Sequence, residues 1–122
     1  PALALFIEID GQVAGTAIAL PDVNQLFQRM NGRLLPTGIF TLLRRRSIIT
    51  RTRLPIMGIM PEYRNRGLEL VLINDVAMNA MKRGYTDGEC SWVLETNSAT
   101  NRAIEAAGGT AYKTYRLYQK DL

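Results

Sequence analysis

The stretch that decides the fold is IMGIMPEYRNRGLE, residues 56–69 of the 122-residue chain. It begins as an apolar strand, passes through a polar segment rich in arginine, and enters a helical pattern that runs from Leu68 to Arg83. A helix N-terminus offers free backbone amides and the positive end of the helix dipole. A strand, a basic loop and a helix in this order therefore predict a site for an anion such as pyrophosphate.

The strand before the loop is predicted to span residues 51–60 and to be interrupted. Pro55 and Gly58 lie inside it, and such residues suit an edge, a bulge or a strand whose backbone meets a ligand. The alternative interpretation also stands, in which Gly67 is an ordinary turn residue and the loop arginines are solvated.

The remaining elements are expected to form a single α/β domain over residues 1–122. Two apolar runs joined at Asp10-Gly11 predict an antiparallel hairpin. A basic helical insert is predicted over residues 21–50, in which Leu26, Phe27 and Met30 share one face of a helix. Further along, the patterns predict strands over 89–94 and 110–120 and a helix over 99–107.

Composition excludes several function classes. The chain has no histidine and one cysteine, Cys90, so imidazole triads, zinc sites and internal disulfides are excluded, and no metal site is predicted. No apolar run is long enough to span a membrane. The single cysteine and the absence of a leader pattern favour a reducing cytoplasmic location.

Residues 59–68, with their apolar residue, Pro61 and R-x-x-G-like loop, resemble the acyl-CoA signature of GNAT-type N-acyltransferases. The likeness covers residues 4–20 and 53–122 and leaves out 21–50. It implies a GNAT-like mixed, mainly antiparallel sheet with helices on both faces. The usual opening strand and two helices of that fold are not matched, and the chain opens at Pro1 without an initiator Met, so we expect it to be the later part of a longer protein.

The resemblance implies an acetyltransferase, or another N-acyltransferase, in which an amine attacks the thioester of acetyl-CoA or another acyl-CoA. Amides near Ile59 would polarise the thioester carbonyl. The remaining cofactor contacts that it implies are Arg64, Asn65, Arg66, Gly67, Leu68, Glu69 and Asn97. The acceptor would be a small-molecule or peptide amine. The candidate catalytic residues are Glu95, as a base for the amine, and Tyr115, as a substitute acid.

Two residues depart from the family pattern. Glu69 stands where the motif has Gly or Ala, and a carboxylate there would repel phosphate, although an acid in a first helical turn also suits the dipole. Ile104 stands seven residues after Asn97, where the family often has the tyrosine that protonates the leaving thiolate. A second hypothesis is therefore a catalytically degenerate GNAT-like module with a binding or assembly role.

The stretch from Val23 to Pro61 holds seven arginines and no acid. Such a stretch can bind nucleic acid, the 3′-phosphate of CoA or acidic lipid, or can be a solvated basic insert. Stacking aromatics are not interleaved with these arginines, so nucleic acid is disfavoured as a partner, and no membrane partner is predicted. The apolar sheet face that the unmatched elements would cover predicts a homodimer or a partner domain.

Overall fold

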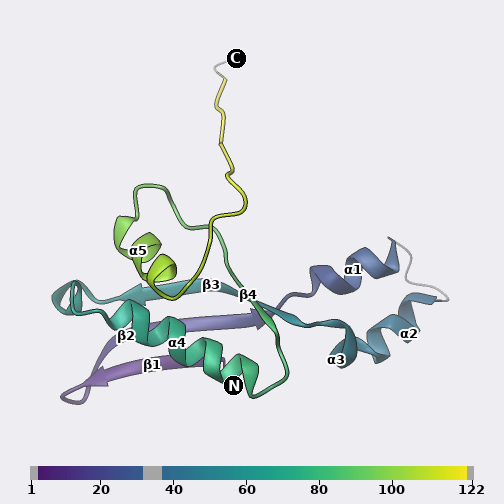
Figure 1. Cartoon of the computed structure of the whole chain (residues 1–122), viewed down its shortest axis with the longest axis horizontal. Coiled ribbons are helices and arrows are strands. Elements are labelled where there is room, and N and C mark those ends of the chain that lie inside the picture. Colours follow the sequence, from purple (N-terminus) through teal and green to yellow (C-terminus); the bar gives the residue numbers. More distant parts are fainter. Residues whose placement is uncertain (1–2, 32–36, 121–122) are drawn as a thin grey trace.

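The computed structural model describes residues 3–31 and 37–120 and has two parts, a sheet with its covering helices and a helical arm (Figure 1). In chain order the elements are β1 (Ala4–Ile9), β2 (Gln12–Pro21), α1 (Asn24–Met30), α2 (Thr37–Leu43), α3 (Arg45–Ile48), β3 (Arg51–Ile59), a 3-10 turn (Pro61–Tyr63), α4 (Leu68–Met81), β4 (Asp87–Cys90) and α5 (Ser98–Ala106). Each helix in the described part is too short or too polar to cross a membrane.

The sheet is mixed and mainly antiparallel, as predicted, with strand order β1-β2-β3-β4. The first three strands pair antiparallel, and β4 joins β3 in parallel. Ile9 pairs with Gln12, which leaves Asp10 and Gly11 as a two-residue turn with φ of 53° and 77°. Positive φ at both positions is what this hairpin turn requires, so the predicted hairpin is confirmed.

Helix α4 covers one face of the sheet and forms the main core with it. The predicted helical pattern is confirmed, because Leu72, Val76 and Ala80, spaced four apart within it, are buried against the sheet, where they meet Ala17 and Ala19 of β2. Residues four apart share one side of a helix, and small residues on β2 allow the helix to approach closely. This packing fixes the N-terminus of α4 beside the end of β3.

Two strand predictions are wrong, one in its extent and the other in its existence. β4 stops at Cys90 instead of residue 94, because pairing with β3 ends at the Leu54 and Cys90 pair and Trp92 takes a left-handed φ of 58°. Residues 110–120 form no strand, and Tyr112, Tyr115 and their neighbours are exposed. A pattern of aromatic residues does not by itself form a strand, and among the described residues no neighbouring strand pairs with this segment.

The arm consists of α1, α2 and α3 and packs around its own small core. Leu26, Ile48 and Ile49 are buried together, with Leu42 packed against them. The helix at 24–30 was expected to bury Phe27 as well, but Phe27 is 58% exposed. The reason is that three short helices enclose a single narrow core, which one side of α1 fills with Leu26.

The sheet face opposite α4 carries exposed apolar side chains. Cross-strand pairing places Phe6 with Thr16, and Ile18 with Ile56, on this face. Phe6 is 64% exposed and Ile56 52% exposed. A helical layer on both faces was expected, and no helix in residues 3–31 and 37–120 covers these side chains.

We predict that this open face causes self-association, because exposed apolar patches favour partners. The chain should form a homodimer or larger assembly in light scattering, and the double variant Phe6→Ser, Ile56→Ser should shift it toward monomer. Leu117→Ser is the control, since Leu117 is fully exposed on the C-terminal segment. A parent chain that stays monomeric over a wide concentration range would contradict the prediction.

Candidate functional site

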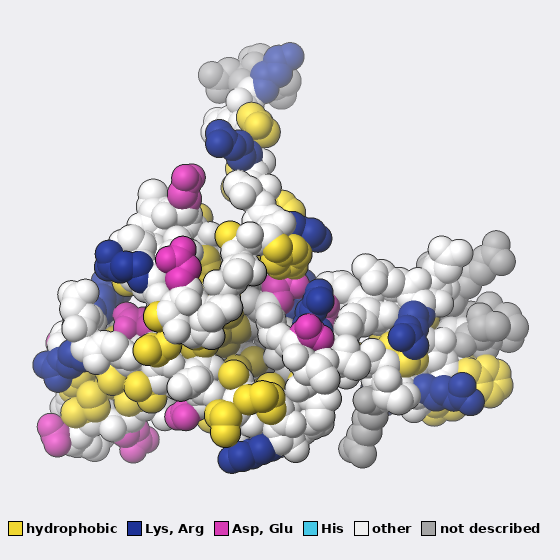
Figure 2. Space-filling view, viewed as in Figure 1, with side chains coloured by type: hydrophobic (Ala, Val, Ile, Leu, Met, Phe, Trp, Pro, Cys, Tyr) yellow, Lys and Arg dark blue, Asp and Glu magenta, His cyan; other side chains and the backbone are white. Residues whose placement is uncertain are grey.

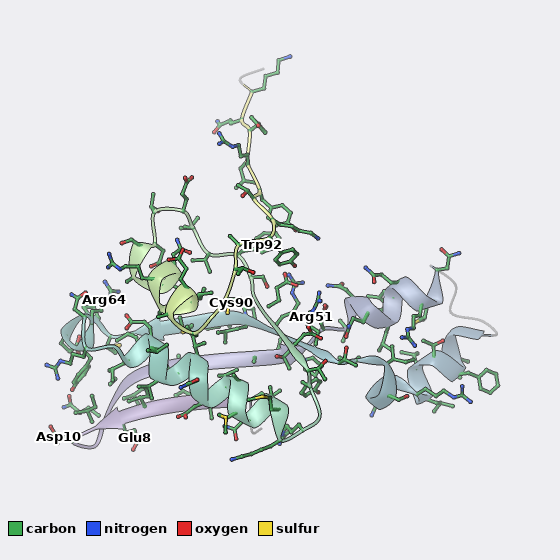
Figure 3. The ribbon with its side chains drawn as sticks, viewed as in Figure 1. Glu8, Asp10, Arg51, Arg64, Cys90 and Trp92 are labelled. Carbon is green, nitrogen blue, oxygen red and sulfur yellow. The ribbon has the colours of Figure 1, made fainter. Side chains whose placement is uncertain are left out.

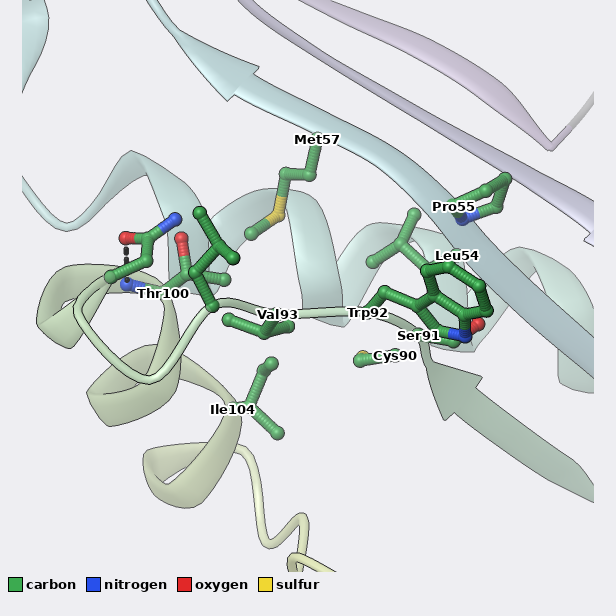
Figure 4. A pocket seen from close by; sticks show the side chains of 11 residues that line it. Leu54, Pro55, Met57, Cys90, Ser91, Trp92, Val93, Thr100 and Ile104 are labelled. Carbon is green, nitrogen blue, oxygen red and sulfur yellow. Dashed lines mark hydrogen bonds between the residues drawn. The ribbon is translucent and has the colours of Figure 1, made fainter. Parts of the chain in front are cut away.

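The candidate site lies where β3 and the chain after β4 diverge. Beyond the Leu54 and Cys90 pair the two segments separate, and α5 lies across the opening (Figure 4). The opening holds a cavity of about 180 Å³, here called the wedge cavity. It is lined by Leu54, Pro55, Met57, residues 90–94, Asn97, Thr100 and Ile104. Most of these side chains are apolar, but polar atoms contribute at least as much of the lining surface, so the cavity suits an apolar group that also makes polar contacts.

A second cavity, of about 370 Å³, lies beside the loop before α4 and is called the loop cavity. Its lining is more polar and consists of Met57, Gly58, Ile59, Arg64, Asn65, Glu69, Asn97, Ala99 and Thr100. Met57, Asn97 and Thr100 line both cavities, so the two adjoin along β3. Together they form a site that is polar at the α4 N-terminus and apolar at the wedge.

The loop is held by local contacts from the end of β3 to the start of α4. Asn65 and Gly67 have left-handed φ values of 61° and 75°. Arg64 Nε donates a hydrogen bond of 3.3 Å to the Ile59 carbonyl, which keeps this guanidinium at the cavity (Figure 3). Arg66 instead stacks on the Tyr63 ring, 5.3 Å from its centroid, and does not line the cavity. Leu68 packs against the core.

Glu69 lines the loop cavity together with Arg64 and Asn65. It lies in the first turn of α4 and is half-buried. The ion pair found in the described part of the chain joins Arg53 to Glu89 at 3.0 Å, so Glu69 has no cationic partner there. The predicted anion site thus has a carboxylate on its wall.

Asn97 connects the two cavities and caps α5. Its Oδ1 accepts a hydrogen bond of 3.3 Å from the Thr100 amide, the usual N-cap contact, at the start of the helix predicted over 99–107 (Figure 4). Because the cap holds the side chain in place, the start of α5 forms a fixed wall for both cavities.

The two catalytic candidates do not reach either cavity. Glu95 is exposed in the turn before α5, and Tyr115 is exposed with its ring 6.1 Å from that of Trp92. Hydrogen bonding to the Glu89 carboxylate raises the pKa of Tyr112, which makes it a poorer acid. No tyrosine lines either cavity in the described part, and Ile104 lines the wedge cavity at the family's acid position.

Sequence reasoning missed the residues at the apex of the wedge. Cys90 and Ser91 line the cavity there, and Ser91 Oγ accepts a hydrogen bond of 3.2 Å from Arg53 Nε. Burial raises the pKa of the Cys90 thiol, with the nearby Glu89 charge adding to the effect, which favours the neutral thiol over the nucleophilic thiolate. The point at which two strands part is set by their pairing, which the sequence pattern does not reveal.

Comparisons with known proteins place these features in context. No family model matches the chain. The bacterial ceramide synthase of Caulobacter vibrioides (strain NA1000 / CB15N) is 40% identical over 126 residues, which cover 98% of this chain and 33% of that protein. Protein YghO of Escherichia coli (strain K12) is 34% identical over 121 residues, covering 94% of this chain and 31% of that protein. The chain thus spans about a third of the length of these relatives.

Solved structures with a similar fold are N-acetyltransferases. The ribosomal-protein-alanine N-acetyltransferase from Brucella melitensis biovar Abortus 2308 matches with a TM-score of 0.62 and 15% identity, over 95% of this chain and 70% of that one. The aminoglycoside N-acetyltransferase AAC(6')-Iy in complex with CoA matches with a TM-score of 0.64 and 19% identity, over 96% of this chain and 74% of that one. The mainly antiparallel sheet, with its β3, loop and α4 unit, therefore has the GNAT-type acetyltransferase fold.

Proposed function

We propose that the chain binds an acyl-CoA and takes part in transferring its acyl group to an amine. The observation that carries this proposal is the pair of adjoining cavities along β3, polar at the α4 N-terminus and apolar at the wedge. The α4 amides and Arg64 would hold the pyrophosphate. The acyl end would then lie against Met57 in the wedge cavity.

The chemistry that such a site supports is direct attack. The amine nitrogen forms a bond to the thioester carbonyl carbon and loses a proton to water, the bond from carbon to sulfur breaks, and CoA leaves as a thiolate that takes up a proton. Backbone amides near Ile59 would stabilise the negative charge that develops on the carbonyl oxygen. Because Ile104 cannot supply the proton, the leaving thiolate would be protonated by water.

The name of one relative favours a lipid amine as acceptor and a long acyl group as donor. A ceramide is the amide of a fatty acid and a long-chain amino alcohol, so a ceramide synthase makes an N-acyl bond, and the Caulobacter protein of that name is 40% identical to this chain. The apolar lining of the wedge cavity, with Leu54, Val93 and Ile104, suits an alkyl chain. A cytoplasmic location, which the single Cys90 favours, belongs to this proposal as well.

A second candidate is a GNAT-like module that binds or assembles without catalysis. Three observations favour it. Glu69 lines the predicted pyrophosphate site, and Ile104 replaces the expected acid, while Glu95 and Tyr115 lie outside both cavities.

Calorimetric titration with acetyl-CoA and with a long-chain acyl-CoA tests both candidates, together with an assay for thiol release in the presence of a long-chain amino alcohol. Binding and thiol release, both stronger with the long-chain donor, would support the transferase. Binding without thiol release would support the second candidate. Absence of binding by every acyl-CoA would contradict the transferase, and the second candidate would then be restricted to an assembly role.

A further inference from the structure

The helical arm carries basic side chains without acidic ones. The segment 23–60, which contains the arm and β3, holds seven of the 15 basic residues and no acid, so the rest of the chain holds eight basic and 11 acidic side chains. Two of the seven, Arg51 and Arg53, belong to β3, and Arg53 is paired with Glu89. Acids such as Glu8 and Asp10 lie at the opposite end of the molecule from the arm (Figure 3). In the space-filling view, the arm shows Lys and Arg colouring with no acidic side chain (Figure 2).

The arm also exposes large apolar side chains next to its arginines. Phe40 is 67% exposed and Leu43 75% exposed, and these two lie three residues apart on one side of α2. Val23, just before α1, and Phe27 on α1 are exposed in the same way. Leu42 packs against the small core instead. Helix α2 therefore has two apolar sides, and the one with Phe40 and Leu43 faces solvent.

The arm is anchored to the sheet at its base. Gln25 Oε1 accepts hydrogen bonds from the amides of Thr50 and Arg51, at 3.0 and 3.2 Å, and the Asp22 amide donates to the Arg51 carbonyl at 2.9 Å. These bonds tie the beginning of the arm to Thr50 and Arg51, where the arm ends and β3 starts. The exposed residues are therefore presented away from the loop that leads into α4 (Figure 1).

We propose that this arm binds the surface of an anionic lipid bilayer. Arginines attract acidic headgroups, while exposed Phe and Leu side chains insert among the acyl chains, and the arm offers both with no acid to oppose them. Nucleic acid would use the arginines but would leave the aliphatic Leu43 and Ile39 exposed. The proposal concerns surface binding, and it replaces the expectation of no membrane partner, which rested on the absence of a spanning segment.

Cosedimentation of the full chain with vesicles tests the proposal. Vesicles of phosphatidylglycerol and phosphatidylcholine in equal parts should bind the chain, and vesicles of phosphatidylcholine alone should bind it weakly. The double variant Phe40→Ser, Leu43→Ser should lose about tenfold or more in affinity. Arg44→Gln and Arg45→Gln should each lose about fivefold, less at high salt. Leu117→Ser, exposed outside the arm, should bind as the parent does.

Several results would overturn the proposal. Equal binding to both kinds of vesicle, or no binding to either, would remove the anionic bilayer as partner. The proposal also fails if the chain retains a single-stranded DNA oligonucleotide through Arg44 and Arg45 but binds no vesicles. Light scattering would also count against the proposal if the parent chain is an oligomer that dissociates in the Phe40→Ser, Leu43→Ser variant. The arm would then be an interface between copies of the chain. Because the proposal does not depend on acyl transfer, it stands or falls separately from the proposed function.

Discussion

Replacing Gly67 by Val is expected to remove CoA binding while the fold persists. Gly67 is the residue before α4, and the pyrophosphate would have to approach the backbone at this point. Its φ is 75°, a conformation that a β-branched residue adopts only with strain. A Cβ on Gly67 would meet no atom of the protein within 4 Å, so the added side chain would occupy space in front of the loop. Calorimetric titration with CoA measures the loss.

Gly84 provides a matched control for this variant. It follows the other end of α4, has a φ of 88°, and a Cβ there would also meet nothing within 4 Å. Gly84→Val should therefore suffer a similar loss of thermal stability, of about 1–3 kcal/mol. Neither glycine lines a cavity, but Gly67 lies between the loop-cavity residues Asn65 and Glu69, whereas Gly84 lies beyond the far end of α4, so Gly84→Val should bind CoA as the parent does. If both variants lose binding equally, the effect is one of strain, and if neither does, the loop is not the CoA site.

The fold was predictable wherever one local signal decided the structure. The Asp10-Gly11 turn, the α4 pattern with Leu72 and Val76, and the helix that Asn97 caps each depend on residues close in sequence, and all three are confirmed. The order of a strand, a basic loop and a helix was equally local. It indicated the GNAT-type fold that the structural neighbours show.

The end of β4 and the wedge cavity could not be predicted, because both depend on pairing between distant segments. The end of β4 is set by where Leu54 stops pairing with Cys90, and no apolar pattern records that point. The wedge cavity follows from this separation, so its apex at Cys90 and Ser91 was missed as well. Glu95 and Tyr115 were chosen for their chemistry, and their positions outside the cavities follow from the turn after Trp92 and from an exposed C-terminal segment.

Glu69→Ala is expected to raise the affinity for CoA about tenfold at low salt. Glu69 lines the loop cavity and has no cationic partner in the described part of the chain. Two unit charges about 4 Å apart interact by about 4 kcal/mol at an effective dielectric near 20. Relief of about 1.4 kcal/mol of this repulsion already corresponds to a tenfold gain. The gain should fall as salt screens the charges.

Controls separate this local repulsion from a change in net charge or in helix stability. Asp75→Ala removes an exposed acid from the same helix, away from both cavities, and should leave CoA affinity unchanged. Glu69→Gln removes the charge but keeps the shape, so it should gain about as much affinity as Glu69→Ala. Thermal stability should change by no more than about 1 kcal/mol, because alanine favours the helix while the interaction of the acid with the dipole is lost.

The outcome also separates the two candidate functions. If Glu69→Ala gains affinity and also gains thiol release with an amine acceptor, the carboxylate alone restrained a working transferase. If affinity rises while thiol release stays absent, protonation of the leaving thiolate by water is insufficient, and the lack of an acid at Ile104 is the remaining defect. An affinity that matches the parent at low salt would mean that Glu69 does not oppose phosphate. The occluded-site explanation would then have to be given up.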